Sequence, residues 1–248
     1  MTDNAPVALI TGAAHRLGAQ TATELHHKGW TVIIHYRSRE EQARALADSL
    51  NAQRPDSAFM VQGDLEQMDD ISRIARQAVS FTGRLDGLVN NASAFFPTPV
   101  SEASESDWNT LMNANLKSPF FLVQACLPAL RQHRGGVVNM IDIYAERPLE
   151  DHPIYCASKA GLAALTRSLA KDLAPDIRVN GVSPGAILWP EQEDAMVQEH
   201  KDRILGKTPL QRTGDPADIA RTIAFLLCDA PYITGHIIPV DGGRSLSI

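Results

Sequence analysis

The chain has 248 residues, of which 44% are hydrophobic and 21% are charged, a composition that is ordinary for a globular protein. Its net charge of −6 comes from interspersed acidic and basic residues, without the basic run that follows a nucleic-acid backbone. No segment reaches the roughly 18 consecutive apolar residues that span a bilayer, and residues 1–6 lack the pattern of a secretory signal. We therefore expect one domain, residues 1–248, in the cytoplasm, with neither nucleic acid nor membrane as a partner.

The cysteines and histidines show none of the spacings of a metal site. Cys126, Cys156 and Cys228 are far apart in the sequence and odd in number, and the eight histidines form no ligand constellation. The sequence predicts buried or half-buried thiols in a reducing compartment, and no bound metal.

Short apolar runs rich in β-branched residues alternate with amphipathic stretches along the whole chain. The seven runs span residues 7–10, 31–35, 58–61, 85–89, 136–141, 177–182 and 237–240. Most do not alternate strictly, which suits strands covered on both faces, and the β-α-β-α rhythm predicts a parallel sheet with right-handed crossovers. The predicted fold class is α/β, a single-domain Rossmann-type doubly wound fold with a seven-stranded parallel sheet and helices on both faces. A polar, helical insertion is expected at 190–206.

A glycine-rich turn follows the first run and opens a helix. Gly12 permits a tight turn, and Gly18 lets the helix approach the sheet, so that the N–H groups at the helix start, beside Leu17, face a pyrophosphate. Arg16 replaces the usual middle glycine, and this cation either folds across the phosphates or points into the active site. The alternative is a tight turn that binds nothing.

The end of the second run distinguishes NAD from NADP. An acidic residue there would bind the ribose 2′-hydroxyl, but the chain carries His35, Tyr36, Arg37, Ser38 and Arg39. Arg37 offers a planar fork of donors to a 2′-phosphate and Ser38 adds a hydroxyl, with no acidic residue to repel the phosphate. Arg39 is equally well explained as a solvated surface residue. The sequence therefore predicts NADPH as the cofactor.

The third and fourth runs end in residues that we also expect beside the cofactor. Asp64, followed by Leu65, either accepts a hydrogen bond from the adenine amino group or caps the next helix. Ala92 is small enough to let the backbone pass close to the cofactor. Asn91, beside it, is a residue type that more often braces a turn than touches a ligand.

Tyr155 and Lys159 lie four residues apart, and therefore on one face of a helix. A phenol has a pKa of about 10, and a fixed ammonium group nearby lowers that pKa towards the working range. The pair is thus expected to act as a general acid. The spacing alone is common by chance, but it becomes a specific signal together with the glycine-rich turn.

These motifs together resemble the short-chain dehydrogenase/reductase family over nearly the whole chain. The matching pieces are residues 11–18, 90–92, Asn115, Tyr155 with Lys159, 184–185 and 241–243. The resemblance implies that Tyr155 donates a proton, that Lys159 binds the nicotinamide ribose, and that Asn115 supports a water relay to Lys159. Pro184 and Gly185 would flank the nicotinamide.

The resemblance also extends to the covering loop and the assembly. Residues 186–208 stand where related enzymes have a loop that covers the substrate. Related proteins are usually homotetramers built on the helices around 116–131 and 157–172, and the resemblance implies the same state here.

One departure from the family pattern concerns the chemistry directly. Asp142 stands thirteen residues before Tyr155, where the family usually has a catalytic serine. A carboxyl group can hold or deliver a proton, especially where burial raises its pKa. It would repel the developing alkoxide of a ketone, so it better matches a substrate with a C=N bond. The alternative is that Asp142 only caps a helix or turn.

Several of these features are similar to the pteridine reductase branch of the family. They are Arg16, Asp142 and the segments 35–38, 91–99 and 147–149. The resemblance implies that Phe95 stacks on the pterin ring opposite the nicotinamide, and that Ser93 and Arg16 bind the pterin edge and the cofactor phosphates. The alternative for Phe95 and Phe96 is ordinary packing in the hydrophobic core. Trp189 either lines the pterin side-chain pocket or lies at a subunit contact.

The function expected from this resemblance is NADPH-dependent reduction of a dihydropterin (dihydrobiopterin, dihydromonapterin or dihydrofolate) to the tetrahydro form. Hydride would pass from C4 of NADPH to C6, with a proton to N5, while Asp142 orients Tyr155 and replenishes its proton. Two alternatives remain: a carbonyl reductase of a 3-oxoacyl thioester or a sugar, and a non-catalytic NADPH sensor.

Overall fold

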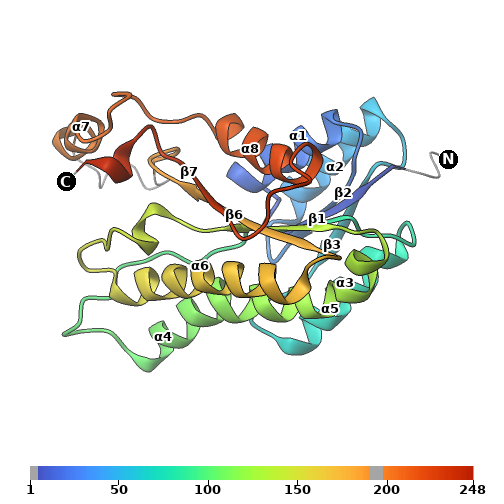
Figure 1. Ribbon diagram of the computed structural model, residues 1–248, viewed down its shortest axis with the longest axis horizontal. Coiled ribbons are helices and arrows are strands. Elements are labelled where there is room, and N and C mark those ends of the chain that lie inside the picture. Colours follow the sequence, from blue (N-terminus) through green and yellow to red (C-terminus); the bar gives the residue numbers. More distant parts are fainter. Residues whose placement is uncertain (1–4, 190–197, 248) are drawn as a thin grey trace.

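All seven predicted runs form strands of one sheet in the computed structural model, which describes residues 5–189 and 198–247 (Figure 1). The strands are β1 (Val7–Ile10), β2 (Thr31–Tyr36), β3 (Ala58–Gln62), β4 (Gly87–Asn90), β5 (Gly136–Met140), β6 (Arg178–Pro184) and β7 (Ile237–Val240). Their order is β3-β2-β1-β4-β5-β6-β7, and every neighbouring pair is parallel. The predicted fold class is confirmed.

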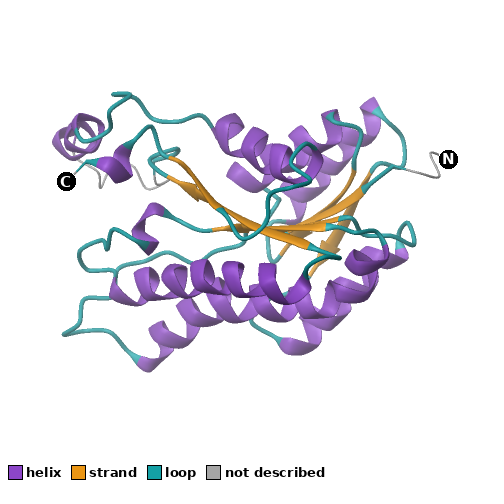
Figure 2. Ribbon diagram, viewed as in Figure 1, coloured by secondary structure: helices purple, strands orange, loops and turns teal. Residues whose placement is uncertain are grey.

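Helices cover both faces of the sheet (Figure 2). One face carries α1 (Arg16–His27), α2 (Glu40–Gln53) and α8 (Pro216–Cys228), and the other carries α3 (Met68–Ser80), α4 (Glu105–Met112), α5 (Ser118–Gln132) and α6 (Pro153–Leu173). Because both faces are covered, successive residues of β1 enter different cores: Ala8 and Ile10 join one cluster, and Val7 and Leu9 the other. This explains why the first run is uniformly apolar.

Shorter helical segments lie between these elements. A π-helical turn, Asn113–Lys117, joins α4 to α5, and 3-10 turns cover Ile143–Ala145 and Arg244–Leu246. Helix α7 covers Gln198–Gly206 and confirms that part of the predicted helical insertion, while 190–197 lie outside the described residues. No helix in the described part of the chain is long and apolar enough to cross a membrane.

Strand β4 begins two residues later than its apolar run. The fourth run was expected from residue 85, but β4 starts at Gly87. The Asp86 carboxylate instead accepts a hydrogen bond from the Val7 N–H at 2.8 Å and pairs with Arg84. The hydrogen bond from Val7 ties the segment before β4 to the start of β1, away from the site.

The strand order reverses between β1 and β4, because the chain moves outward through β2 and β3 before returning to β4. Ligands of doubly wound sheets bind in the crevice at this point, beyond the carboxyl ends of the strands. The residues that follow β1 to β4 are therefore placed to meet at one edge of the sheet.

Candidate active site

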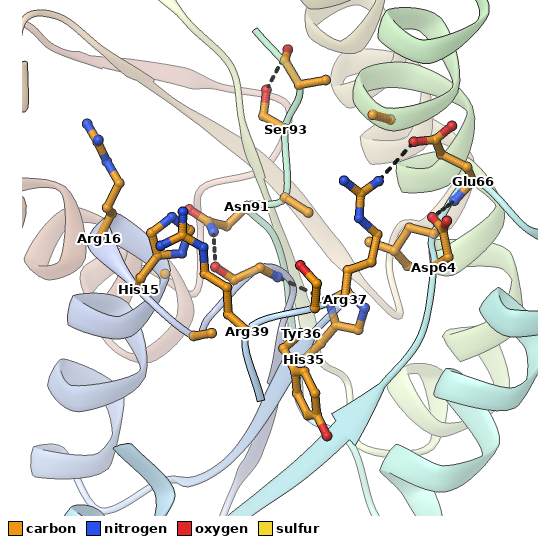
Figure 3. A pocket seen from close by; sticks show the side chains of 18 of the residues that line it. His15, Arg16, His35, Tyr36, Arg37, Arg39, Asp64, Glu66, Asn91 and Ser93 are labelled. Carbon is orange, nitrogen blue, oxygen red and sulfur yellow. Dashed lines mark hydrogen bonds and ion pairs between the residues drawn. The ribbon is translucent and has the colours of Figure 1, made fainter. Parts of the chain in front are cut away.

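A pocket of about 480 Å³ opens beyond the ends of β1, β2, β3 and β4 (Figure 3). Its lining brings together the predicted cofactor segments: Gly12, Arg16, Leu17, Gly18, His35, Tyr36, Arg37, Ser38, Asp64, Leu65, Asn91, Ala92 and Ser93. Segments as far apart in the sequence as Gly12 and Ser93 thus share one cavity. Pro184 and Gly185 end β6 and begin the next loop, outside this lining.

The glycine-rich turn has the close packing that was predicted for it. Gly12 has a φ of +61°, in the left-handed region that favours glycine. A Cβ on Gly18 would lie 2.5 Å from the Gly12 carbonyl oxygen, so only glycine lets α1 start this close to the turn. The Asn91 side chain donates to the carbonyls of Thr11 at 2.8 Å and Gly12 at 3.2 Å. Asn91 therefore braces the turn.

The start of α1 faces the pocket and suits an anion. The first turn of α1 contains no acidic residue, and His15, the residue before it, makes no side-chain cap hydrogen bond. Helix N-termini attract phosphates through their N–H groups and the helix dipole. Arg37 and Arg39 line the same pocket. These residues fit a dinucleotide phosphate, although the whole chain is negatively charged.

Arg16 lines the pocket, and its guanidinium group reaches the covering loop. Its φ is +53°, which confirms that it occupies a glycine-like position. Its Nη2 donates to the carbonyl oxygens of Trp189 at 3.2 Å and Leu188 at 3.5 Å. Loop carbonyls outside helices and strands need such donors, so Arg16 ties the glycine-rich turn to the start of the covering loop.

His35 and Tyr36 line the pocket, and the His35 ring supports the glycine-rich turn. The Gly12 N–H donates to His35 Nδ1 at 3.1 Å, and His35 Nε2 lies 3.1 Å from the Gly63 carbonyl oxygen. Burial lowers the pKa of His35 to about 4, so the ring is neutral and accepts at one nitrogen while it donates at the other. Tyr36 is buried, and its ring turns away from Arg37 (Figure 3).

Arg37 reaches the pocket as predicted, but with a partner that the sequence pattern did not reveal. Its side chain is 63% exposed, and its Nη1 lies 3.2 Å from Glu66 Oε1. Asp64, for which two roles were open, accepts the Glu66 N–H at 3.0 Å. Asp64 therefore holds the turn before α3, and Glu66 stands beside Arg37 because of that turn.

Asp142 and Tyr155 meet at the chemical end of the site. The Tyr155 hydroxyl donates to Asp142 Oδ2 at 2.7 Å, and Asp142 Oδ1 accepts the Tyr144 N–H at 2.9 Å. Burial raises the pKa of Asp142 above the ordinary carboxyl value, against the two hydrogen bonds and Lys159, which lower it. Asp142 is therefore both a turn cap and the partner of the Tyr155 hydroxyl.

The expectation that Lys159 lowers the pKa of Tyr155 is wrong. Burial, and then the Asp142 carboxyl group, raise the pKa of Tyr155, which is 4% exposed. The Lys159 ammonium donates to the Met140 carbonyl at 2.9 Å and lies 5.8 Å from the centre of the Tyr155 ring. Burial lowers the pKa of Lys159 itself to about 8. Tyr155 is thus a neutral phenol, the form that donates a proton.

Asn115 joins the pocket to the chemical end. Its Oδ1 accepts from the Ser93 hydroxyl and the Ala94 N–H, both at 2.9 Å. Its Nδ2 donates to the Ala94 carbonyl at 2.9 Å and the Ser158 hydroxyl at 3.0 Å. The amide group is fully used in holding Ser93 and Ala94 against α6, and the water relay to Lys159 stays a prediction.

Phe95 and Phe96 have different surroundings. Phe95 is 53% exposed, and its ring lies edge-on to Tyr155 with centroids 4.8 Å apart. His152 stacks on Phe95 at 4.8 Å with an interplanar angle of 16°. Phe96 instead packs against the buried cluster of Leu111 and its neighbours. Of the two, Phe95 is the ring that is open to a ligand beside Tyr155.

Comparison with known proteins agrees with this arrangement. A family model described as enoyl-(acyl carrier protein) reductase matches residues 12–245. The chain belongs to the short-chain dehydrogenase/reductase family. Pteridine reductase 1 of Leishmania tarentolae is 37% identical to it over 284 residues, covering 98% of this chain and 97% of the relative. A 3-oxoacyl-acyl-carrier-protein reductase of Staphylococcus aureus is 36% identical over 239 residues, covering 95% of this chain and 96% of the relative.

Sequence reasoning missed three side chains of this short-chain dehydrogenase/reductase. His15 and Glu66 line the pocket, and His152 stacks on Phe95. Glu66 lies two residues after Asp64, so the end of the third run was a signal that could have found it. His15 and His152 directly precede helices, and nothing in the sequence pattern around them indicates a position at the site.

Trp189 lies close to the start of α7. Lys201 Nζ lies 5.6 Å from the centroid of the Trp189 ring, and the Trp189 carbonyl accepts from Arg16. Its placement in a pterin side-chain pocket or at a subunit contact stays open. Within residues 5–189 and 198–247, no group of three or more His, Cys, Asp or Glu side chains is arranged to hold a metal ion. Cys126 and Cys156 are buried free thiols, and Cys228 is partly buried.

Proposed function

We propose that this short-chain dehydrogenase/reductase is an NADPH-dependent pteridine reductase that converts a dihydropterin to the tetrahydro form. The observation that carries the proposal is the 2.7 Å hydrogen bond from the Tyr155 hydroxyl to Asp142. It places two proton-carrying groups together where the family usually has a tyrosine and a serine. A carboxyl group with a raised pKa can supply a proton to a ring nitrogen, whereas a ketone reductase gains little from it, because a carboxylate would repel the developing alkoxide.

The chain's own residues then have distinct tasks. Bound NADPH supplies the hydride, which passes from C4 of its nicotinamide to C6 of a 7,8-dihydropterin. Tyr155 and Asp142 hold the proton that reaches N5, and Asp142 keeps the phenol oriented and replenishes its proton. With a fully oxidised pterin, hydride would reach C7 and Tyr155 would protonate N8. Lys159 would bind the nicotinamide ribose.

Substrate placement would depend on the loop after β4. The exposed Phe95 ring, edge-on to Tyr155, offers a flat surface for one face of the pterin. The Ser93 hydroxyl, fixed by Asn115, belongs to a residue that lines the pocket, and it would bind the pterin edge. Both side chains belong to a segment that Asn115 holds in place, so the stacking surface is formed before a ligand arrives.

The choice of NADPH is supported by Arg37 at the pocket. An exposed guanidinium at the end of β2 can bind a 2′-phosphate with two parallel hydrogen bonds. We expect Arg37→Ala to weaken NADPH binding about tenfold, equivalent to about 1.4 kcal/mol, and to leave NADH binding nearly unchanged. Titration of the reduced nicotinamide fluorescence measures both dissociation constants. Equal weakening of both cofactors would reject the assignment.

A side-by-side assay tests the proposed reaction. NADPH oxidation is followed with dihydrobiopterin, dihydrofolate and acetoacetyl thioester at matched concentrations. The proposal expects turnover with a dihydropterin or dihydrofolate that exceeds turnover of the thioester.

A second candidate is a 3-oxoacyl reductase, because relatives with that name are 35–36% identical over 95% of this chain. Turnover of the thioester alone would establish it and reject the pterin. No turnover with any of the three substrates would favour the non-catalytic sensor.

The assembly is part of the proposal. Trp108 is 49% exposed and Phe120 is 37% exposed, and both line a groove of about 640 Å³ between α4, α5 and α6. We infer that a second copy covers this face in a homotetramer, as the family resemblance implies. Light scattering after size exclusion should then give about four times the 27.0 kDa chain mass, and a monomer mass would contradict it.

A further inference from the structure

A carboxylate stands in the part of the pocket where the sequence pattern showed only cations. Glu66 comes from the connection between β3 and α3, and it lines the same pocket as Arg37 and Arg39. In Figure 3 the side chains of Glu66 and Arg37 turn toward one another, and their charged atoms lie 3.2 Å apart. The site expected to receive a 2′-phosphate therefore already holds a negative charge on its arginine.

The backbone that carries Glu66 is fixed by a chain of hydrogen bonds. The Glu66 N–H donates to Asp64 Oδ1 at 3.0 Å, and the Gln67 N–H donates to the Asp64 carbonyl at 3.0 Å. The Asp64 N–H in turn donates to Asp70 Oδ2 at 2.6 Å. Glu66 is also the less exposed partner, with 26% of its side chain accessible against 63% for Arg37. The carboxylate is thus held at the pocket by its turn.

This position makes Glu66 a competitor of the 2′-phosphate. A phosphate monoester carries between one and two negative charges near neutral pH, and it needs the same guanidinium group whose Nη1 donates to Glu66 Oε1. A cofactor with a 2′-hydroxyl meets no such repulsion. A carboxylate can accept a hydrogen bond from that hydroxyl, which is what the acidic residue after the second strand does in NAD-binding folds.

We propose that Glu66 is a specificity-determining residue that restrains the preference of this site for NADPH over NADH. It does so by holding Arg37 and by opposing the 2′-phosphate. The inference rests on the proposed use of NADPH. Arg37 favours binding of the 2′-phosphate, and Glu66 opposes it.

The test uses adenosine 2′,5′-bisphosphate and 5′-ADP as probes, with binding to the full-length protein measured by calorimetry. Glu66→Gln keeps the shape of the side chain and removes the charge. We expect the bisphosphate to bind about 3- to 10-fold more tightly, the scale of one partly exposed charge interaction, and 5′-ADP affinity to change little. The ratio of NADPH to NADH affinity, measured by fluorescence, should rise by the same factor.

The control is Glu40→Gln, which removes the same charge from a comparable ion pair. Glu40 pairs with Arg44 at 2.6 Å on α2, and neither residue lines the pocket. This variant should leave the affinity of both probes unchanged, because it alters the net charge of the protein equally but removes no charge from the pocket. An equal gain in both Gln variants would reduce the effect to general electrostatics and overturn the proposal.

Arg37→Met separates failure of this inference from failure of the proposed function. If Arg37→Met weakens only the bisphosphate while Glu66→Gln leaves it unchanged or weaker, Glu66 orients Arg37 instead of opposing the phosphate, and the inference is overturned. If Arg37→Met weakens both probes equally, the proposed NADPH preference itself fails. Both positions lie at the surface, and the thermal midpoint of each variant should confirm that it is folded.

Discussion

The two ends of the site use their charged residues in opposite ways. At the cofactor end, Arg37 is 63% exposed and recognition depends on surface charge and on a backbone turn. At the chemical end, Tyr155 and Lys159 are 4% and 2% exposed, and burial shifts the pKa of both groups. Each exposed ion pair contributes little free energy by itself, whereas the charge state of each buried group depends on its neighbours. The comparison predicts that substitutions at the cofactor end weaken cofactor binding by moderate amounts, and that substitutions at the chemical end reduce catalysis strongly.

The largest effect is expected from Tyr155→Phe at the chemical end. Removal of the hydroxyl removes the proton donor and leaves Asp142 Oδ2 without this hydrogen bond. We expect kcat to fall about a thousandfold, within the range for loss of a general acid, while NADPH binding stays near its original value. Single-turnover NADPH oxidation and fluorescence titration measure the two quantities.

Tyr144→Phe is the matched control, because the Tyr144 hydroxyl accepts from Arg244 at 3.0 Å, whereas the Tyr155 hydroxyl donates to Asp142. It should keep most of the activity. If both variants lose the same amount, the Asp142–Tyr155 pair has no special role.

Gly18→Ala sharpens the comparison at the cofactor end, where shape matters more than any one charge. The added Cβ would lie 2.5 Å from the Gly12 carbonyl oxygen and 2.8 Å from Ala13 Cα, so the turn has to shift. We expect a loss of about 1 to 3 kcal/mol in the free energy of unfolding, and NADPH binding about tenfold weaker or more. Gly206→Ala, where a Cβ meets nothing within 4 Å, should change neither. Unaltered NADPH binding in Gly18→Ala would show that the turn does not hold the phosphates.

The pH dependence of catalysis should separate Asp142 from Lys159. Because burial raises the pKa of Asp142, its proton is retained below that raised value and lost as the pH rises through it. Asp142→Asn should lower kcat/KM for a dihydropterin about tenfold to a hundredfold at acidic pH. It should also remove the fall in activity that accompanies loss of the Asp142 proton as the pH rises. Deprotonation of Lys159 near pH 8 should weaken its contact with the nicotinamide ribose, and we expect the resulting loss of activity to remain in this variant. An unchanged profile would exclude Asp142 as a proton source.

The smallest effect concerns stability. Burial lowers the pKa of Lys159 from 10.5 to about 8, so the unfolded chain binds this proton more tightly than the folded one. Below pH 8 the buried charge opposes folding, and that opposition fades as the pH rises from 8 towards 10. The free energy of unfolding of the wild type relative to Lys159→Met should therefore rise over this interval in urea denaturation. A difference that does not vary with pH would contradict the burial of the ammonium group.

The sequence predicted best what depends on local rules. The seven apolar runs, the glycine positions and the spacing of Tyr155 and Lys159 all follow from periodicity and backbone geometry, and the structure confirms them. Asp142 was singled out because it departs from a family pattern, and its contact with Tyr155 is confirmed.

What could not be predicted depends on three-dimensional surroundings. The pKa of Tyr155 is raised rather than lowered because the phenol is buried and, second, because its hydroxyl faces the Asp142 carboxyl group, and no spacing reveals either. Glu66 reaches Arg37 across two neighbouring strand ends, although the residues are 29 positions apart in the sequence. Arg16 turns to the carbonyls of Leu188 and Trp189, which lie more than 170 residues further along the chain.

The most direct test of the account exchanges the group that distinguishes this site. In Asp142→Ser, the usual family residue replaces the carboxyl partner of Tyr155. The ratio of kcat/KM for dihydrobiopterin to that for acetoacetyl thioester, measured with NADPH in the wild type and in this variant, should fall at least tenfold, about 1.4 kcal/mol of transition-state discrimination. A ratio that stays the same or rises would contradict the claim that the Asp142–Tyr155 pair serves a ring nitrogen.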